Sequence, residues 1–493
     1  MNAIVETGVL TGAPTGTPTG APGFLARYEA LKGSLPGDST LRAAAAEAFR
    51  TLGLPGASRG RRAEAWKYTS LQALGGMAFR QPDGNGVALP LSPSPPLSLP
   101  QSLPLSSPLP RHPPARPGDL PRHGAGMDPP VKPGDDGVMA GHDGALAEGD
   151  GAPGGGAAAR TPEYRLFFAG GHYQAGLSTA VPGFARFAEQ PDFGILSWPD
   201  RDPMVALNTM LAEDGACLTI PAGHDMGVVH LIHSGIDGAS AHPRHLIRLG
   251  AGARLTLIDT ASGEGAYLHN PVTEIHVADG AVLTHVRVQN ESTAAFHMAT
   301  IYAAIAARGT YDGFTLNTGG RITRTEIHAS LDGPGAVAHM NGAQLLTGSQ
   351  HADFTSVVRH AAPRGTSRQT VKNVLDGHAR GVFQGRIEVA RGAQKTDGYQ
   401  MNRALLLSPD AEIDTKPELE IFADDVKCSH GATVGELDAE QLFYLRSRGI
   451  PDQEARSLLV RAFLAEALDP VTNETARTLL ETEVARWWES QTA

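Results

Sequence analysis

The sequence predicts a mainly β protein whose core is a right-handed parallel β-helix, flanked by small N-terminal and C-terminal helical domains. Residues 218–426 contain β-branched or alternating runs, such as 254–258 and 282–288, with no helical pattern between them. Glycine-containing corners recur there every 26 to 30 residues or so, which suits a unit of short strands stacked as a solenoid. A jelly roll or sandwich is the alternative, but the steady spacing favours the solenoid. The corners are Gly252-Ala253, Gly280-Ala281, Gly309-Thr310, Gly335-Ala336, Gly365-Thr366 and Gly392-Ala393.

Helical patterns flank this region. Apolar residues at helical spacing begin at Phe24, and a second helix is expected between the cap residues Asp38 and Gly53. In the segment 64–71 that follows, the aromatic residues Trp66 and Tyr68 are expected to pack a small helical domain rather than to bind a ligand.

The C-terminal residues also change to a helical period. Asp438 and Gln441 form a capping-box pair, Gly449 ends that helix, and Pro451 fits the first position of the next one. A final helix is expected around 476–488. We expect these helices to cover the last open turn of the solenoid, to provide a docking surface for a partner, or both.

Composition divides the chain into six parts. Residues 81–160 are rich in proline, glycine and serine and predict a disordered linker or insertion, and the first 20 residues predict a disordered tail. The expected parts are a tail at 1–20, an N-terminal helical domain at 21–80, the insertion at 81–160, a hairpin that joins the N-terminal domain to the core at 161–180, the β-helix at 181–435 and a C-terminal helical domain at 436–493.

The overall composition excludes several classes of protein. The 493 residues exceed one ordinary compact domain unless the fold is repetitive, and the net charge of −11 argues against a nucleic-acid binder. Cys217 and Cys428 are too few and too far apart for a disulfide framework. The N-terminus does not read as a secretory signal, and no apolar run approaches the ~20 residues needed to span a bilayer. We therefore expect a cytoplasmic protein that binds neither nucleic acid nor membrane.

Common catalytic motifs are absent from the sequence. It contains no Gly-x-x-x-x-Gly-Lys-Ser/Thr loop, no nucleophile elbow and no His-Glu-x-x-His motif. The β region is rich in histidine, but only His230 and His233 have a spacing typical of metal ligands, and we expect the histidines on the outer faces of strands. The chain is therefore expected not to be an enzyme.

A chemically suggestive pair lies in the segment 427–433, Lys-Cys-Ser-His-Gly-Ala-Thr. Side chains at i and i+2 of a strand share a face, so Cys428 and His430 would project together. A thiolate beside an imidazole suits iron, zinc or an iron–sulfur cluster, but two ligands do not close such a site. Either the missing ligands come from elsewhere in the fold or from a second chain, or the pair is only a buried cysteine and a surface histidine.

The flanking segments 413–426 and 435–450 extend this motif, and 64–71 adds a weaker match. From about residue 394 to 468 the sequence resembles the SufB/SufD family of the SUF iron–sulfur cluster assembly system. The motif Cys-Ser-His-Gly-Ala-Thr and the scarcity of cysteine favour the SufD branch of the family over the SufB branch. The long insertion departs from the usual compact family pattern. Members of this family are β-helix proteins, which agrees with the fold predicted from the glycine corners.

The resemblance implies a role for the chain as a non-catalytic SufD-like subunit of a SufBCD complex, a scaffold for de novo cluster assembly. It implies a heterodimer with a SufB-like paralogue through the C-terminal strands, or a homodimer when alone, and no permanent cofactor. His430, with Cys428 in a secondary role, would help the partner hold a transient cluster. The C-terminal helices would dock a SufC-like ABC ATPase through Leu442, Phe443, Tyr444, Arg446, Arg448, Leu458, Leu459 and Phe463. Two alternatives remain: a SufB-like principal scaffold, and a structural adaptor for the ATPase without cluster chemistry.

Overall fold

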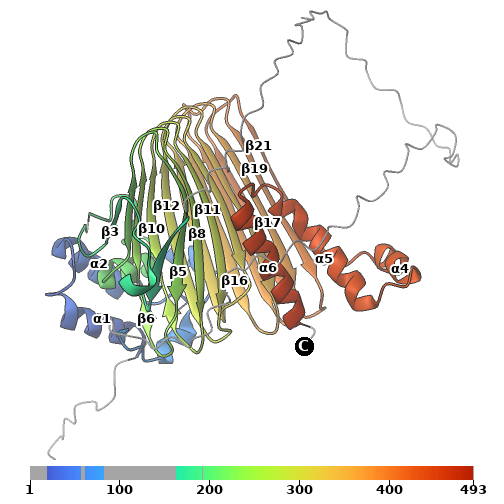
Figure 1. Ribbon diagram of the computed structural model, residues 1–493, viewed down its shortest axis with the longest axis horizontal. Helices are drawn as coiled ribbons and strands as arrows, with labels where there is room; N and C mark the ends of the chain where they lie inside the picture. Colours follow the sequence, from blue (N-terminus) through green and yellow to red (C-terminus); the bar gives the residue numbers. More distant parts are fainter. Residues whose placement is uncertain (1–18, 57–60, 83–162, 191, 492–493) are drawn as a thin grey trace, which may run out of the picture. The chain divides into compact units, whose positions relative to one another are not determined.

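The chain forms a parallel β-helix with helices packed against its outer faces (Figure 1). The computed structural model describes residues 19–56, 61–82, 163–190 and 192–491. Nearly all of the predicted insertion at 81–160 and of the predicted tail lies outside these residues. Within them, no helix is long and apolar enough to cross a membrane.

Successive strands alternate between two sheets, so that most turns of the β-helix add one strand to each sheet. We name the sheets after their last strands. In sheet order, the β21 sheet consists of β2 (His172–Tyr173), β1 (Glu163–Ala169), β5 (Asp225–Ser234), β8 (Arg254–Gly263), β11 (Val282–Glu291), β13 (Thr310–Asn317), β15 (Val337–Leu346), β17 (Thr366–Leu375), β19 (Asp397–Leu406) and β21 (Lys427–Gly435).

The second layer is the β20 sheet, and short extra strands accompany it where the chain turns between the sheets. It consists of β20 (Glu412–Ile421), β18 (Arg380–Val389), β16 (His351–His360), β14 (Ile322–Leu331), β12 (Phe296–Ile305), β10 (Val272–Val277), β7 (Arg244–Leu249), β4 (Ala216–Ile220) and β3 (Phe184–Arg186), with β6 (Ser240–Ala241) pairing with β9 (Leu268–His269) and β9 with β12.

The register of the ladders explains the repeat seen in the sequence. Val282 of β11 lies opposite Arg254 of β8 and Thr310 of β13, in parallel pairing. Only the β1–β2 and β3–β4 pairs of the described residues are antiparallel. The glycine corners are the places where the chain passes from one sheet to the other. The predicted parallel β-helix is therefore confirmed.

The main core lies between the two sheets and is built of stacked aliphatic side chains. Residues one turn apart occupy equivalent positions, so each inward-facing position extends as a column along the β-helix. Fully burying one Val, Leu or Ile contributes roughly 1.5–3 kcal/mol, so every added turn stabilises the one before it. One such column in the β20 sheet is Ile247, Ile275, Ala303, Ala329, Val358, Ile387 and Leu419.

Helices near the N-terminus pack against the outside of the β20 sheet around β9 and β12. Trp66 is buried there, donates from Nε1 to Asp202 (3.1 Å) and lies 4.3 Å from the Arg324 guanidinium, which agrees with a packing role. Asp38 and Gly53 cap one of these helices as expected. The elements are α1 (Gly20–Leu31), α2 (Ser39–Leu52), α3 (Pro203–Leu211) and the 3-10 helices η1 (Arg61–Trp66), η2 (Gln72–Gly76) and, beside β1, η3 (Ala175–Leu177).

The C-terminal helices are α4 (Ala439–Ser447), α5 (Asp452–Leu468) and α6 (Glu474–Ser490). The expectation that they cover the last open turn is wrong, because α5 and α6 lie along the outer face of the β21 sheet (Figure 1). The outward positions of this sheet carry apolar residues such as Val286 and Phe314, which pack against the apolar stripe of α5 and α6. Pro451 is the N-cap of α5 rather than its first helical residue.

Candidate functional site

The last turn of the β-helix is open. Among the described residues, β21 pairs only with β19, and β20 pairs only with β18. The side chains of β20 and β21 are mostly exposed or half-buried, whereas those of β18 and β19 are mostly buried or half-buried. The outer edges of β20 and β21 therefore present unpaired backbone N–H and C=O groups, on which a further strand could pair.

Cys428 and His430 lie on β21 at this open end. In the ladder, Cys428 is opposite Gly398 and His430 is opposite Gln400, and both of these β19 residues are buried. Because side chains alternate along a strand, Cys428 and His430 share the face that is directed between the two sheets. Cys428 packs partly against the core, and His430 is exposed.

A shallow hollow of about 450 Å³ lies on the outer face of the β21 sheet at this end, and Cys428 is one of the residues that line it. Arg368 forms its wall, together with Asp397, to which it donates two hydrogen bonds of 2.9 and 3.1 Å. Burial raises the pKa of the Cys428 thiol, so it stays protonated at neutral pH unless a metal or a partner changes its surroundings. The hollow is completed by Tyr399, Lys427 and Ser429.

The described residues provide one sulfur and one imidazole at this position, which is half of a tetrahedral metal or cluster site. Large apolar side chains of the same open end are also exposed to solvent. Ile421 is 38% exposed, Phe422 65% and Val434 54%. Exposed apolar groups beside an unpaired strand edge are typical of a protein–protein contact. The open end therefore has the features of a contact surface for a second chain.

The residues expected to dock a partner lie on α4 and α5. Phe443, Tyr444 and Leu458 are strongly exposed, and α4 has no buried residue at all. Arg448 lies over the Tyr444 ring at 4.2 Å, which holds both side chains on the surface.

The other expected docking residues are less accessible. Leu442 and Leu459 are half-buried, while Arg446 is exposed and forms an ion pair with Asp452 at 3.4 Å. Phe463 packs against the β21 sheet with the Lys372 ammonium 4.6 Å from its ring. Phe463 therefore belongs to the packing of α5 rather than to the free surface.

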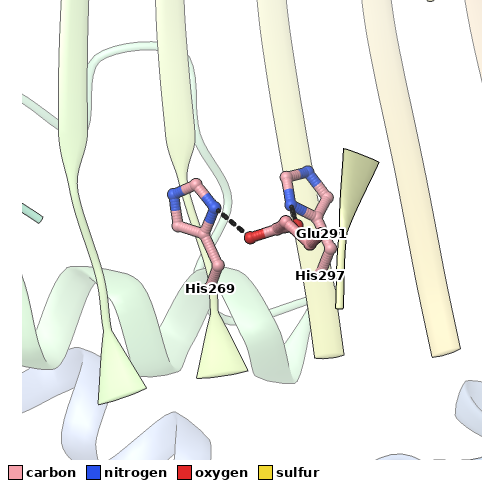
Figure 2. A group of neighbouring side chains, drawn as sticks. All are labelled: His269, Glu291 and His297. Atoms are coloured by element: carbon pink, nitrogen blue, oxygen red, sulfur yellow. Dashed lines mark hydrogen bonds and ion pairs between the residues drawn. The ribbon is translucent and has the colours of Figure 1, made fainter. Parts of the chain in front are cut away.

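Sequence reasoning missed several buried histidines in earlier parts of the β-helix, two of which, His269 and His297, lie beside Glu291 (Figure 2). The expectation that the histidines lie on outer strand faces is wrong for the seven that are buried. The signal was the repeat itself: His269 and His297 are one turn apart and therefore stack in register on β9 and β12. The seven buried residues are His233, His242, His245, His269, His285, His297 and His360.

A family model and several known proteins match this chain. The family model described as the SufBD core domain of SUF system FeS cluster assembly matches residues 231–463. The iron–sulfur cluster assembly protein SufD of Escherichia coli is 32% identical over 320 residues, covering 63% of this chain and 76% of that protein.

Two further relatives match over a smaller share of their length. An iron–sulfur cluster assembly SufBD family protein of Synechocystis is 34% identical over 279 residues, covering 54% of this chain and 62% of its own. Protein ABCI7, chloroplastic, of Arabidopsis thaliana is 35% identical over 242 residues, covering 48% of this chain and 51% of its own. The aligned region thus spans less than two thirds of these two relatives.

The thiol of Cys428 should react slowly with iodoacetamide at pH 7.5, because its pKa is raised above the ordinary value of about 8.5. Its labelling rate should keep rising with pH beyond the point at which a free cysteine peptide levels off. Cys217 provides a control in the same chain, since burial raises its pKa to about 12 and should make it slower still. Peptide mass spectrometry measures both rates, and labelling of Cys428 at the rate of the free peptide would contradict this account.

Proposed function

Because this chain belongs to the SufB/SufD family of the SUF iron–sulfur cluster assembly system, we propose that it is a SufD-like, non-catalytic subunit of a SufBCD-type scaffold. The observation that carries this proposal is the open last turn, where Cys428 and His430 lie beside unpaired strand edges and exposed apolar side chains. An isolated solenoid with such an end would expose a template for uncontrolled association.

The partner at the open end is a SufB-like paralogue. A second β-helix with a similar turn can continue both sheets by pairing its own last strands with β20 and β21, which satisfies their free N–H and C=O groups. The same contact covers Phe422 and Val434. Pairing strand to strand also fixes the register, so that residues of the partner lie at a defined distance from His430.

The nascent cluster is the cargo of this interface rather than a resident cofactor. The exposed imidazole of His430 provides one nitrogen ligand, and Cys428 provides a thiol that becomes a ligand only after losing its proton. Side chains of the paralogue supply the remaining ligands. A cluster held by groups from two chains is labile, because separation of the chains removes half of its ligands.

The α4–α5 surface docks a SufC-like ABC ATPase. Its support is that Phe443, Tyr444 and Leu458 are exposed, although α5 itself is anchored on the β21 sheet. An ATPase bound there could transmit closure of its dimer through α5 and α6 to the strands that they contact. Lys372 of β17 makes this link directly, because its Nζ is 2.7 Å from Glu466 of α5.

Replacing His430 by Ala should leave assembly of the complex intact and lower cluster formation, because the variant removes a ligand without touching the strand ladder. Ser429→Ala is the matched control, since Ser429 is the neighbouring exposed residue on the opposite face of β21. Cluster formation is followed by absorption and circular dichroism during reconstitution with iron and sulfide.

Undiminished cluster formation in His430→Ala would contradict the ligand role and favour the structural adaptor. A wild-type chain that holds iron and sulfide when purified alone would instead favour the principal scaffold.

Replacing Phe443 by Ala should weaken binding of the ATPase at least about fivefold, because truncation of a central aromatic residue typically costs about 1 kcal/mol or more. The thermal midpoint should stay unchanged, since Phe443 is 73% exposed. Leu177→Ala, at an exposed apolar residue in η3, is the control. Isothermal titration of the chain with the ATPase measures both, and equal affinity of the two variants would contradict docking through α4.

A further inference from the structure

A second group of chemically active side chains lies inside the β-helix, several turns away from Cys428 and His430. His269 belongs to β9, Glu291 is the last residue of β11, and His297 belongs to β12. All three are buried. They meet at the corner where the chain passes from the β21 sheet to the β20 sheet, because one turn of the β-helix brings His269 and His297 into register.

The donor atoms of these residues converge (Figure 2). The carboxylate of Glu291 lies between the two rings, with Oε1 3.1 Å from His269 Nδ1 and Oε2 2.6 Å from His297 Nδ1. One ligand atom from each residue lies within 4.8 Å of the other two. Two imidazoles and one carboxylate are the protein ligands of many zinc sites and of non-haem iron(II) sites.

Several polar atoms at this corner have no hydrogen-bond partner. His297 Nδ1 is close to Glu291 Oε2, but its N–H direction does not meet the oxygen, so the contact lacks hydrogen-bond geometry. Both ring nitrogens of His233 lack a hydrogen-bond partner, although the residue is only 3% exposed. Such atoms call for an ion or an ordered water.

A small enclosed space adjoins these atoms. It has a volume of about 10 Å³, and His233, Tyr267 and His269 are part of its lining. This volume is close to that of one water-sized sphere. The ring centroids of His233 and His269 are 5.1 Å apart, and those of His269 and His297 are 5.0 Å apart, so the histidines form a continuous row. The site therefore has a place for one further ligand.

The charges around the site favour a cation. Asp259 is compensated by Arg287, which donates from Nε to its Oδ2 at 3.1 Å. Among the described residues, the partners of Glu291 are His269, His297, the amide of Gln289 and the hydroxyl of Tyr267, and none of them is a lysine or an arginine. A buried carboxylate without a countercharge is costly, and a bound cation would remove that cost.

Binding of a metal ion at this site requires that the proton of the His297 ring moves from one ring nitrogen to the other. Arg287 Nη2 is 3.3 Å from His297 Nε2, and because a guanidinium only donates, Nε2 accepts this bond while Nδ1 carries the proton. A metal bound at Nδ1 moves that proton to Nε2 and ends this long contact. Arg287 keeps its bond to Asp259.

We propose that His269, Glu291 and His297 bind one divalent transition-metal ion, with His233 or a water molecule from the adjoining cavity as a further ligand. The nitrogen and oxygen ligands suit Zn²⁺ or Fe²⁺ and lack the thiolates that an iron–sulfur cluster prefers. This site is separate from the open end, and it does not depend on the scaffold role of the chain.

Titration of the chelator-treated full chain with Zn²⁺, and anaerobically with Fe²⁺, tests the site. Calorimetry and elemental analysis should find one ion per chain. Glu291→Gln should weaken the binding more than about tenfold, since even a group that only orients a ligand commonly contributes that much. His360→Gln is the matched control, because His360 is buried on β16 with Ser367 as its partner and should leave the affinity unchanged.

X-ray absorption of the loaded protein tests the same site without relying on a folded Glu291 variant. The Cys428→Ser/His430→Ala double variant should keep the ion, with nitrogen and oxygen ligands at about 2.0–2.2 Å and no sulfur at about 2.3 Å. Loss of the ion in this double variant would assign it to the open end and overturn the proposal. A wild-type chain that takes up no ion, or equal affinities of Glu291→Gln and His360→Gln, would also overturn it and leave water as the occupant of the cavity.

Discussion

The unpaired backbone at the edge of β21 is the constraint on which the function of this molecule depends. Each earlier turn of the β-helix is stabilised by the next, which pairs with its N–H and C=O groups and covers its inward side chains. The last turn has no successor among the described residues, and the C-terminal helices that could have covered it lie on the face of the β21 sheet instead. The last turn is therefore the place where a strand of another chain could continue the stack.

The same constraint explains why the chemically suggestive residues lie where they do. A ligand on an inward face of an interior turn is enclosed, as with His269 and His297. A side chain on the inward face of the last turn, such as His430, is exposed. One repeated backbone can thus provide a closed buried site and an open shared site, and the difference depends only on the position of the turn in the stack.

The sequence predicted the repeat well, because glycine corners and β-branched runs depend on local backbone preferences. Asp38, Gly53 and Asp438 likewise predicted the ends of helices through local hydrogen bonding. It did not predict α3, whose residues are all buried and therefore show no amphipathic period. The packing of α5 on the β21 sheet was also missed, because it depends on which strand face carries apolar residues several turns away.

The two sites also differ in how far the sequence alone could place their residues. Cys428 and His430 are two residues apart, so the alternation of one strand was enough to place them on one face. His269, Glu291 and His297 come from three strands and meet only when the exact register of consecutive turns is known. A regular interval gives the approximate turn length, but a shift of one residue would direct one ring outward.

Hydrogen–deuterium exchange at β21 tests the central claim most directly, because it reports on the backbone groups of the open edge. The chain alone should show fast exchange at those amides of β21 that are not bonded to β19. In the complex with a SufB-like paralogue these amides should become strongly protected, while α6 stays unchanged. An assembled complex in which β21 exchanges as fast as in the free chain would show that the partner binds elsewhere, and it would contradict the account.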